Sequence, residues 1–342
     1  MTAVRTIAVA CGADDDMRPW LCAVRDRGVR MLVLPRVYPA ARREELEQAA
    51  QISDRADARA APPAAGDGEG CVLLATSGSS GTPRLVELSW RALEASARRG
   101  AERIPFGAGD AWHGSLSPAH VGGLMIHARA LVLGGEVRVA KPPRIWRDLD
   151  GCTHCSLVAP QLARLLEDPD DPPASLRAVM LGGGPSPQAL HDAAIARGVP
   201  LHSTYGMTET ASQVATGRRA QGDLATLAGL PLRGVSIAID AATREILVDG
   251  PMLARAIIRD GDRAPLARPH ATRDAGFLDA AGRLHVVGRL DAMFISGGKN
   301  IHPEEIERAL GSLACVRSAC VVAVPHDKWG MRPVAFVDLA SP

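Results

Sequence analysis

Short apolar runs that alternate with amphipathic patterns constrain the fold of this chain more than any other feature. The runs that predict buried strands are residues 6–10, 29–34, 71–76, 130–133, 137–140, 155–159 and 177–182. The helical patterns lie at 17–27, 40–50, 122–130, 160–167 and 187–197, with one more helix from about residue 90. Strands and helices in alternation are typical of layered α/β structure.

The pattern changes after residue 210. Short strands at 235–239, 245–248 and 283–287 are separated by Gly, Asp and Pro turns, which predicts a smaller, mostly antiparallel β unit. An amphipathic helix follows, with Pro and two Glu residues in its first turn at 303–305, where the helix dipole favours acidic side chains. Further strands are expected at 319–324 and 333–338.

These patterns predict an α/β protein with a large N-terminal domain and a partial, small α+β C-terminal domain. The N-terminal domain comprises a reduced first subdomain, a layered α/β subdomain and the β-rich unit. The expected bounds are 1–70, 71–226 and 227–290 for these three parts, and 291–342 for the C-terminal domain. Residues 56–70 are rich in Ala, Pro, Gly and acidic residues, and we expect them to form a linker or a long surface loop.

The composition excludes several classes of partner. The net charge is +1 without a basic block, so nucleic acid is not an expected partner. No apolar run approaches the length of about 20 residues that spans a bilayer, and acidic residues at 14–16 interrupt any signal-peptide pattern. Seven irregularly spaced cysteines suit a reducing compartment, so we expect a cytoplasmic protein without disulfides. The pair Cys152 and Cys155 lacks a second CxxC, and we interpret it as core thiols rather than as zinc ligands.

Two polar segments carry the chemistry. The sequence STYGMTET at 203–210, preceded by GGGPSP at 182–187, combines hydroxyls, an aromatic ring and a carboxylate, and we interpret it as a loop with the parts of a nucleotide and metal site. A buried strand runs directly into TSGSSGTPR at 76–84, where glycine amides, hydroxyls and Arg84 can surround phosphate oxygens. This second segment is not a Walker loop, because the lysine motif is absent. A flexible Ser/Gly turn is the alternative interpretation.

The order of the motifs resembles the adenylate-forming superfamily of acyl-CoA synthetases, luciferases and adenylation domains. The matching segments are TSGSSGTPR, GGGPSP, STYGMTET, TRDAG at 272–276 and GRLDAMFISGGKNIHPEEIE at 288–307. The resemblance covers the chain from about residue 70 onward. It implies ATP, Mg²⁺ and CoA as cofactors, and a reaction in which a carboxylate attacks the α-phosphate of ATP before a thiol captures the acyl-adenylate. Such a reaction needs positioning and charge stabilisation rather than a protein nucleophile.

The resemblance implies a role for each motif residue. Arg84 stands where the family usually has a lysine, Thr208 is expected at the α-phosphate, Glu209 at Mg²⁺ and His120 beside the acyl pocket. Asp291 matches the hinge of the family's small domain. The residues expected to hold the β- and γ-phosphates are Thr76, Ser77, Gly78, Ser79, Ser80, Gly81 and Thr82. Those expected around adenosine are Gly183, Gly184, Tyr205, Gly206, Asp274 and Arg289. The acyl or CoA pocket is expected to include Gly122, Gly123, Ser212 and Gly298.

The flanking sequences resemble one branch of the superfamily most. GMTETASQ at 206–213 and VPHDKWGMRPVAFV at 324–337 are similar to the ligases that join o-succinylbenzoate to CoA in menaquinone biosynthesis. Three alternatives stay open: another acyl- or aryl-CoA ligase, an enzyme that loads a carrier-protein thiol, and a non-catalytic adenylate-binding module. The expected partners are therefore small molecules, with no membrane span and an undetermined oligomeric state.

Two departures from the family pattern affect these expectations. The segment before the phosphate loop is about half the usual length. The family's C-terminal lysine, which bridges the substrate carboxylate and the α-phosphate, has no match, because Lys299 and Lys328 lie at other positions. Two interpretations stay open: the chain is a truncated form of a longer protein, or its adenylation step is impaired while thiol capture of a supplied adenylate survives.

Overall fold

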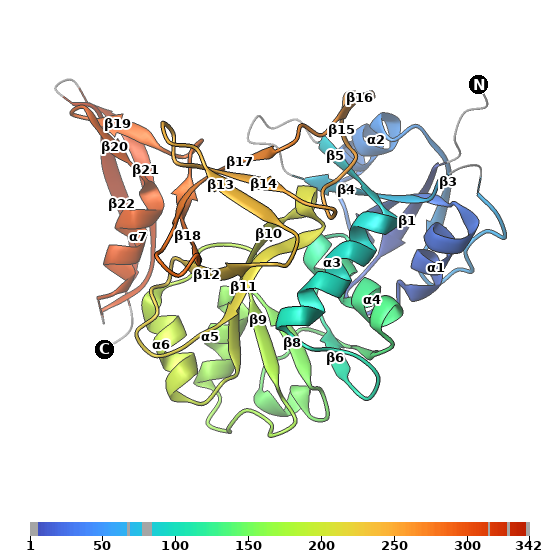
Figure 1. The fold of residues 1–342 in the computed structure, drawn as a ribbon, viewed down its shortest axis with the longest axis horizontal. Helices are drawn as coiled ribbons and strands as arrows, with labels where there is room; N and C mark the ends of the chain where they lie inside the picture. Colours follow the sequence, from blue (N-terminus) through green and yellow to red (C-terminus); the bar gives the residue numbers. More distant parts are fainter. Residues whose placement is uncertain (1–5, 67–68, 77–83, 314, 327–328, 340–342) are drawn as a thin grey trace.

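The computed structural model describes residues 6–66, 69–76, 84–313, 315–326 and 329–339. The described strands form a seven-stranded, an eleven-stranded and a four-stranded sheet. In Figure 1 the four-stranded sheet lies at one end of the molecule and the N-terminal strands lie at the other, with the eleven-stranded sheet between them. The predicted class, layered α/β with an antiparallel region and a small α+β unit, is confirmed.

The chain opens with the predicted alternation of strands and helices. Strand β1 (Thr6–Cys11) lies between β2 (Arg30–Pro35) and β3 (Ile52–Asp57), and the three strands are parallel. Helices α1 (Arg18–Arg27) and α2 (Ala40–Ala49) connect them. Strand β3 escaped prediction, because its sequence ISDRAD contains no apolar run. Its charged residues occupy the edge of the sheet, where charge discourages pairing with another chain.

Four more strands complete the seven-stranded sheet. Strand β4 (Cys71–Thr76) pairs parallel with β2 and antiparallel with β5 (Arg84–Ser89). Strands β15 (Ala256–Arg259) and β16 (Asp262–Pro265) extend the sheet beyond β5. Part of the segment 227–290 thus pairs with N-terminal strands. The division of the chain into domains at residue 290 stays a prediction.

The eleven-stranded sheet has a parallel half and an antiparallel half. The parallel half consists of β6 (Ala111–Gly114), β7 (Glu136–Val139), β8 (His154–Leu157), β9 (Ala178–Leu181) and β10 (Leu201–Met207). The antiparallel half consists of β11 (Ser212–Arg218), β12 (Leu227–Pro231), β13 (Ser236–Ile239), β14 (Glu245–Asp249), β17 (His270–Leu278) and β18 (Leu284–Arg289). The β10–β11 hairpin joins the two halves.

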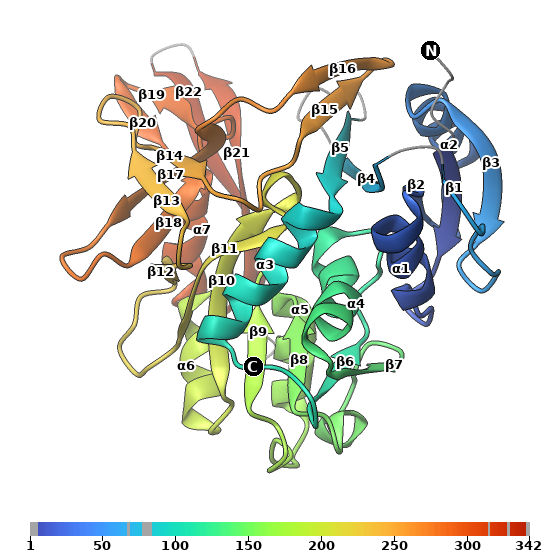
Figure 2. The same cartoon turned by 45° about the vertical axis from the view of Figure 1, so that its right-hand side comes forward.

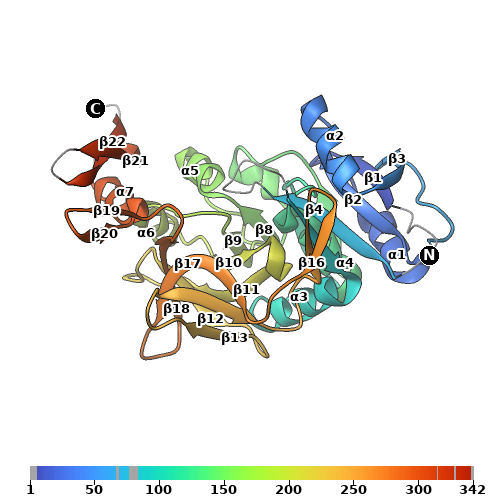
Figure 3. The ribbon, with the colours of Figure 1, turned by 90° about the horizontal axis from the view of Figure 1, so that it is seen from above.

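Helices cover both large sheets and fill the space between them. Helices α1, α3 (Trp90–Arg103) and α4 (Val121–Leu133) share one apolar core with both sheets, and Figure 2 shows α3 beside α4. Helix α2 packs on the outer face of the seven-stranded sheet, on the side of β1 and β2 opposite α1 (Figure 3). Helices α5 (Ala159–Glu167) and α6 (Gln188–Ala196) cover the other face of the eleven-stranded sheet, beside a short 3₁₀ helix at Trp146–Leu149.

The structure corrects two sequence predictions. Residues 130–133 end helix α4 and do not form a strand, because an apolar run without periodicity fits a buried helix equally well. Gly134 then ends the helix in the left-handed region. The stretch 203–210, interpreted as a loop, instead continues strand β10 as far as Met207 and then forms a 3₁₀ turn at Thr208–Thr210.

The last elements form a separate small sheet with one helix. Its strands are β19 (Phe294–Ser296), β20 (Lys299–Ile301), β21 (Val316–His326) and β22 (Gly330–Leu339). Helix α7 (Pro303–Gly311) begins with proline and carries Glu304 and Glu305 in its first turn, as predicted. The Glu307 carboxylate accepts a hydrogen bond of 2.8 Å from the Val321 amide, which ties α7 to β21. None of the described helices is long and apolar enough to cross a membrane.

Two adjacent glycines in the first turn of α4 test the packing. A Cβ on Gly123 would collide with the backbone carbonyl oxygens of Leu116 and Ser117, whereas the nearest atom to a Cβ on Gly122 is a Leu116 methyl carbon at 3.7 Å. Gly123→Ala should lower the free energy of unfolding by about 1–3 kcal/mol through overpacking. Gly122→Ala should leave it unchanged or raise it by up to about 1 kcal/mol. Urea denaturation of both variants measures the difference, and equal effects would contradict this packing.

Candidate active site

Two adjoining cavities lie where the parallel strands end. Residues that follow the carboxyl ends of β4, β6, β8, β9 and β10 line them, as is usual for ligand sites of open α/β sheets. The larger cavity has a volume of about 930 Å³ and the smaller one about 330 Å³. Both are lined by Gly182, Gly183, Thr204, Gly206, Met207 and Arg289. A single extended ligand can therefore occupy both.

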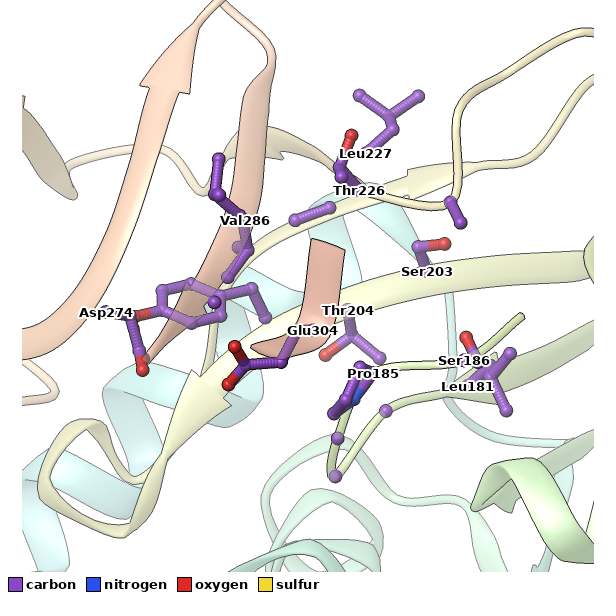
Figure 4. Close-up of a pocket in the computed structure, with 18 of the residues that line it drawn as sticks. Leu181, Pro185, Ser186, Ser203, Thr204, Thr226, Leu227, Asp274, Val286 and Glu304 are labelled. Atoms are coloured by element: carbon purple, nitrogen blue, oxygen red, sulfur yellow. The ribbon is translucent and has the colours of Figure 1, made fainter. Parts of the chain in front are cut away.

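A tyrosine, an aspartate and an arginine form one end of the smaller cavity. The Tyr205 hydroxyl donates a hydrogen bond of 2.7 Å to the Asp274 carboxylate, and the Arg289 guanidinium donates one of 3.2 Å to the other carboxylate oxygen. Figure 4 shows Asp274 at this end of the cavity. Tyr205 lies on β10, Asp274 on β17 and Arg289 on β18. Asp274 and Arg289 lie side by side because they are register partners in the antiparallel half of the sheet. Their arrangement presents a flat ring beside a carboxylate that keeps free lone pairs.

Burial controls the protonation of these groups. Burial raises the pKa of Asp274, although Tyr205 and Arg289 oppose the shift, and the side chain is 7% exposed. Burial and the nearby Asp274 carboxyl raise the pKa of Tyr205 well above its usual value of 10.0, so its hydroxyl stays a hydrogen-bond donor at neutral pH. The hydrogen bond with Asp291 raises the pKa of Arg289, which keeps its charge.

Glycines bring bare backbone to the lining of the cavities. A Cβ on Gly206 would collide with the backbone of Ser212 across the β10–β11 hairpin, so only glycine fits this position. Gly183 adopts a left-handed backbone with φ 85°, whereas Gly184 has open space around it. All three glycines line a cavity, and their contact with a nucleotide stays a prediction.

The far end of the smaller cavity holds polar residues that motif reasoning missed. The Ser186 hydroxyl lies 2.6 Å from His191 Nε2, and Nδ1 of the same buried ring has no hydrogen-bond partner among the described residues. Burial, followed by the charge of Arg219, lowers the pKa of His191 to about 4, so the ring is neutral at pH 7. Ser203 also lines this end (Figure 4), and its buried hydroxyl has no partner among the described residues. Ser186 and Ser203 lie within the GGGPSP and STYGMTET motifs, which gave them no role, and His191 lies outside every motif.

The larger cavity contains an ion pair between two predicted catalytic residues. Arg84 Nη2 lies 2.8 Å from Glu209 Oε1, and Arg84 Nε donates a hydrogen bond of 2.9 Å to the Thr76 hydroxyl. Glu209 is only 4% exposed, so its carboxylate depends on this cation for compensation. Thr208 lines the same cavity. The predicted phosphate-loop residues Ser77, Gly78, Ser79, Ser80, Gly81 and Thr82 lie outside the described residues.

The remaining predicted residues divide into two groups. His120, Gly122, Gly123 and Ser212 line the larger cavity. His120 is exposed at the N-cap of α4, while Gly123 is packed against the chain at Leu116 and Ser117. Gly298 lies between β19 and β20 and lines neither cavity, so its role in an acyl or CoA pocket stays a prediction.

A buried arginine in the larger cavity has no counterpart in the motif assignments. Arg129 of α4 is 3% exposed, donates a hydrogen bond of 2.7 Å to the Gln213 side-chain oxygen and lies over the Trp112 ring at 5.2 Å. Burial lowers the pKa of Arg129 to about 10, which leaves it protonated at neutral pH. Its described hydrogen-bond partner is neutral, so a desolvated cation faces the cavity without a described carboxylate to balance it. Its signal in the sequence is weak, because an arginine inside an apolar helix also fits a surface position.

The C-terminal unit contacts the smaller cavity directly. Glu304 of α7 accepts a hydrogen bond of 3.1 Å from the Arg289 amide, and Arg308 donates one of 2.8 Å to the Val287 carbonyl. Both residues line the cavity, and Figure 4 shows Glu304 opposite Thr204. The predicted hinge residue Asp291 accepts hydrogen bonds of 2.9 and 2.8 Å from the Arg289 side chain. The residue between the two units is therefore coupled to the site through Arg289.

Comparison with known proteins identifies the family. The family model described as "AMP-binding enzyme" matches residues 16–256, and the "AMP-binding enzyme C-terminal domain" model matches residues 305–342. The first match covers well over half of the chain. The chain therefore belongs to the AMP-binding enzyme family.

Individual relatives share a narrower description. The 2-succinylbenzoate–CoA ligase of Salmonella typhimurium is 39% identical over 272 residues, which is 79% of this chain and 58% of the relative. The ligase of the same description from Bacillus cereus is 35% identical over 291 residues, covering 79% of this chain and 60% of the relative. The chain thus spans about three fifths of the length of these curated relatives.

Solved structures agree with this grouping. The o-succinylbenzoate CoA synthetase of Bacillus subtilis, in complex with its acyl-adenylate intermediate, superposes with a TM-score of 0.86 at 26% identity. The match covers 99% of this chain and 79% of that one. The same synthetase in complex with ATP and magnesium ion gives a TM-score of 0.83, with 99% and 80% coverage.

The buried Asp274 predicts a pH-dependent stability difference. Because burial raises its folded-state pKa, the group stabilises the fold below its unfolded-state pKa of about 3.9 and loses that contribution as the pH rises through the folded-state pKa. Asp274→Asn, which keeps an acceptor for Tyr205, should therefore be more stable than the parent chain at pH 7. The difference should vanish below about pH 4. Urea titrations across this range measure it, and a variant that is less stable at pH 7 would contradict the pKa assignment.

Proposed function

We propose that this protein is an ATP-dependent acid–thiol ligase that converts o-succinylbenzoate to its acyl-adenylate and then to the CoA thioester. The observation that carries the proposal is the pair of adjoining cavities, with Tyr205 and Asp274 lining the smaller one and Arg84 and Glu209 lining the larger one. A ring and a carboxylate suit a nucleoside, and a cation beside a carboxylate suits phosphates. The family assignment and the relatives described as 2-succinylbenzoate–CoA ligases support it.

The first step needs charge stabilisation around phosphorus. An oxygen of the substrate carboxylate bonds to the α-phosphorus, the bond from that phosphorus to the bridging oxygen breaks, and pyrophosphate leaves. Thr208 and Arg84 line the cavity where the phosphates fit and can stabilise the charge that shifts to the leaving group. Asp274 accepts from the ribose hydroxyls and fixes the nucleotide along the axis of the two cavities.

The donor set near Glu209 fits Mg²⁺. A single buried carboxylate binds a hard cation when substrate phosphates and water supply the remaining oxygen ligands. The described residues include no group of three or more potential metal-binding side chains, so the ligands must come largely from the nucleotide. Bound Mg²⁺ neutralises charge on the phosphates. Arg84 already lies 2.8 Å from Glu209 and holds the carboxylate in the cavity until the cation and nucleotide bind.

The second step is attack by the CoA thiolate on the acyl carbonyl carbon. A carbon–sulfur bond forms, the bond to the phosphate oxygen breaks and AMP leaves. His120 is exposed at the rim of the larger cavity, within the same lining as Gly122 and Ser212. We propose that this rim receives the thiol. We also propose a cytoplasmic location, because all seven cysteines are free thiols and ATP and CoA are abundant there.

Arg129 supports a substrate with two carboxylates. One carboxylate of o-succinylbenzoate is consumed by adenylation, and the other needs a cation in a desolvated pocket. Arg129 is a protonated, almost fully buried guanidinium in the larger cavity, hydrogen-bonded only to the neutral Gln213 oxygen among the described residues. A planar guanidinium pairs with a carboxylate through two parallel hydrogen bonds. A monocarboxylic acid would leave this cation unbalanced.

Isotope exchange tests the proposed activity. ATP–pyrophosphate exchange should depend on o-succinylbenzoate and should be weak with benzoate or succinate alone. Addition of CoA should then yield the thioester, detected by mass spectrometry, whereas a carrier protein should give no product. If exchange depends on a different acid, that acid is the substrate instead. If the chain binds ATP but forms no product with any acid, it is a non-catalytic adenylate-binding module.

Substitution of Arg129 tests the acid assignment. Arg129→Met keeps the length of the side chain and removes its charge. The KM for o-succinylbenzoate should rise between about tenfold and about a hundredfold, as for loss of a hydrogen bond to a charged group. The KM for ATP should stay within about twofold, and any residual turnover of benzoate should not fall. A parallel loss for both acids would assign Arg129 to the fold rather than to the acid.

A further inference from the structure

Arg273 has a backbone conformation that side chains other than glycine rarely adopt. It lies in strand β17 with φ 62°, in the left-handed region where the Cβ of an L-residue is crowded by the backbone. Asparagine and aspartate tolerate this region better, because their short side chains form local hydrogen bonds. The long side chain of an arginine forms no such local hydrogen bond in the left-handed region. Such an outlier is a reason to look for a functional role of the side chain.

The surrounding strands impose this conformation. The Arg273 amide donates a hydrogen bond of 2.7 Å to the Glu245 carboxylate, and its carbonyl accepts one of 2.8 Å from the Leu290 amide. The neighbouring Thr272 hydroxyl donates 2.8 Å to the Ile246 carbonyl. These bonds use only the backbone of Arg273, so a glycine would keep all of them without strain. The arginine side chain is not needed for this local structure.

The side chain instead belongs to the larger cavity. Arg273 is exposed and lines the cavity, close enough to Asp291 to contribute to the lowered pKa of that carboxyl after Arg289. The charged residues in the lining are Arg42, Arg84, Arg129, Arg273, Arg289 and Glu209. Arg84 is paired with Glu209, and Arg289 with Asp274 and Asp291. Among the described residues, the Arg273 guanidinium forms no hydrogen bond or ion pair of its own.

We propose that Arg273 binds a phosphate group of a nucleotide substrate in the larger cavity. The inference rests on the proposed function, which brings two phosphate-bearing substrates, ATP and CoA, to this site. A guanidinium presents a planar fork of donors that matches phosphate oxygens, so one well-placed arginine contributes both affinity and orientation. Arg273 lines the cavity that these phosphates would enter.

The chain provides a matched control in Arg244. This residue also has φ 62° and an exposed side chain, but it lies in the β13–β14 connection and lines neither cavity. Arg273→Gly should relieve backbone strain and raise the Tm by about 2 °C. Arg244→Gly relieves the same strain but also removes the guanidinium that lies 5.8 Å from the Phe277 ring centroid, so its gain in Tm should be smaller. Only Arg273→Gly should weaken phosphate binding. Arg273→Asn, which tolerates φ > 0 without a charge, should behave like the glycine variant, and Arg273→Lys should retain part of the affinity.

Calorimetry and kinetics on the full chain distinguish the two phosphate sources. Calorimetric titration with Mg·ATP measures the affinity for ATP. The KM for CoA in thioester formation measures the interaction with CoA. We expect Arg273→Gly to weaken one of these about tenfold while Arg244→Gly stays within twofold of the parent. Weaker binding of ATP would show that Arg273 binds the phosphates of ATP. A higher KM for CoA would show that it binds the phosphates of CoA.

Two results would overturn the inference. One is unchanged binding of both substrates by Arg273→Gly in a parent chain that binds them, which leaves the proposed function intact. The other is a Tm of Arg273→Gly several degrees below the parent, which would show that the side chain serves the fold. A parent chain that binds neither ATP nor CoA would overturn the proposed function together with this inference.

Discussion

The buried carboxylate of Asp274 connects the main parts of this structure. It accepts hydrogen bonds from Tyr205 in the parallel half of the large sheet and from Arg289 in the antiparallel half. Arg289 also binds Asp291, the first residue of the segment that leads to the small C-terminal sheet. An ionised carboxylate that is 7% exposed is costly unless such donors surround it. The bonds that balance this charge therefore also hold together the strands that form the smaller cavity.

Positively charged side chains outnumber negatively charged ones in the lining of the larger cavity. Five arginines and one glutamate line it, and the cations lie at different depths. Arg129 is buried, Arg84 is half-buried beside Glu209, and Arg273 is exposed. A doubly charged acid and a triphosphate can both be balanced by this lining, whereas an apolar acid cannot use its deepest cation.

Much of the fold was predictable because apolar periodicity reports burial. The first four elements, helices α5 and α6 and the acidic start of α7 follow the expected bounds closely. The errors have physical causes. The fully apolar end of α4 gives no periodicity, and the polar edge strand β3 gives no apolar run. The pairing of β15 with β5 joins segments far apart in sequence, which local patterns cannot report.

The motifs named residues that the fold brings together, and the roles of these residues stay predictions. Lining the two adjoining cavities are Thr76, Arg84, Tyr205, Glu209, Asp274 and Arg289. Their meeting depends on strand order, which places the motif after β9 next to the β10–β11 hairpin. Arg129 and His191 were missed because they lie outside the motifs, and only the fold brings them to the cavity walls. Arg273 and Ser186 lie within the motifs TRDAG and GGGPSP, but the resemblance assigned them no role.

We propose that one acyl-adenylate occupies both cavities along the axis from Asp274 to Arg129. The decisive experiment is a crystal structure of this chain with a non-hydrolysable acyl-adenylate analogue of o-succinylbenzoate. We expect the adenosine to lie against Tyr205 with its ribose hydroxyls on Asp274, and the free carboxylate of the acyl group to bind Arg129. An analogue bound with its base in the larger cavity, or with its carboxylate in solvent and Arg129 still on Gln213 alone, would contradict it.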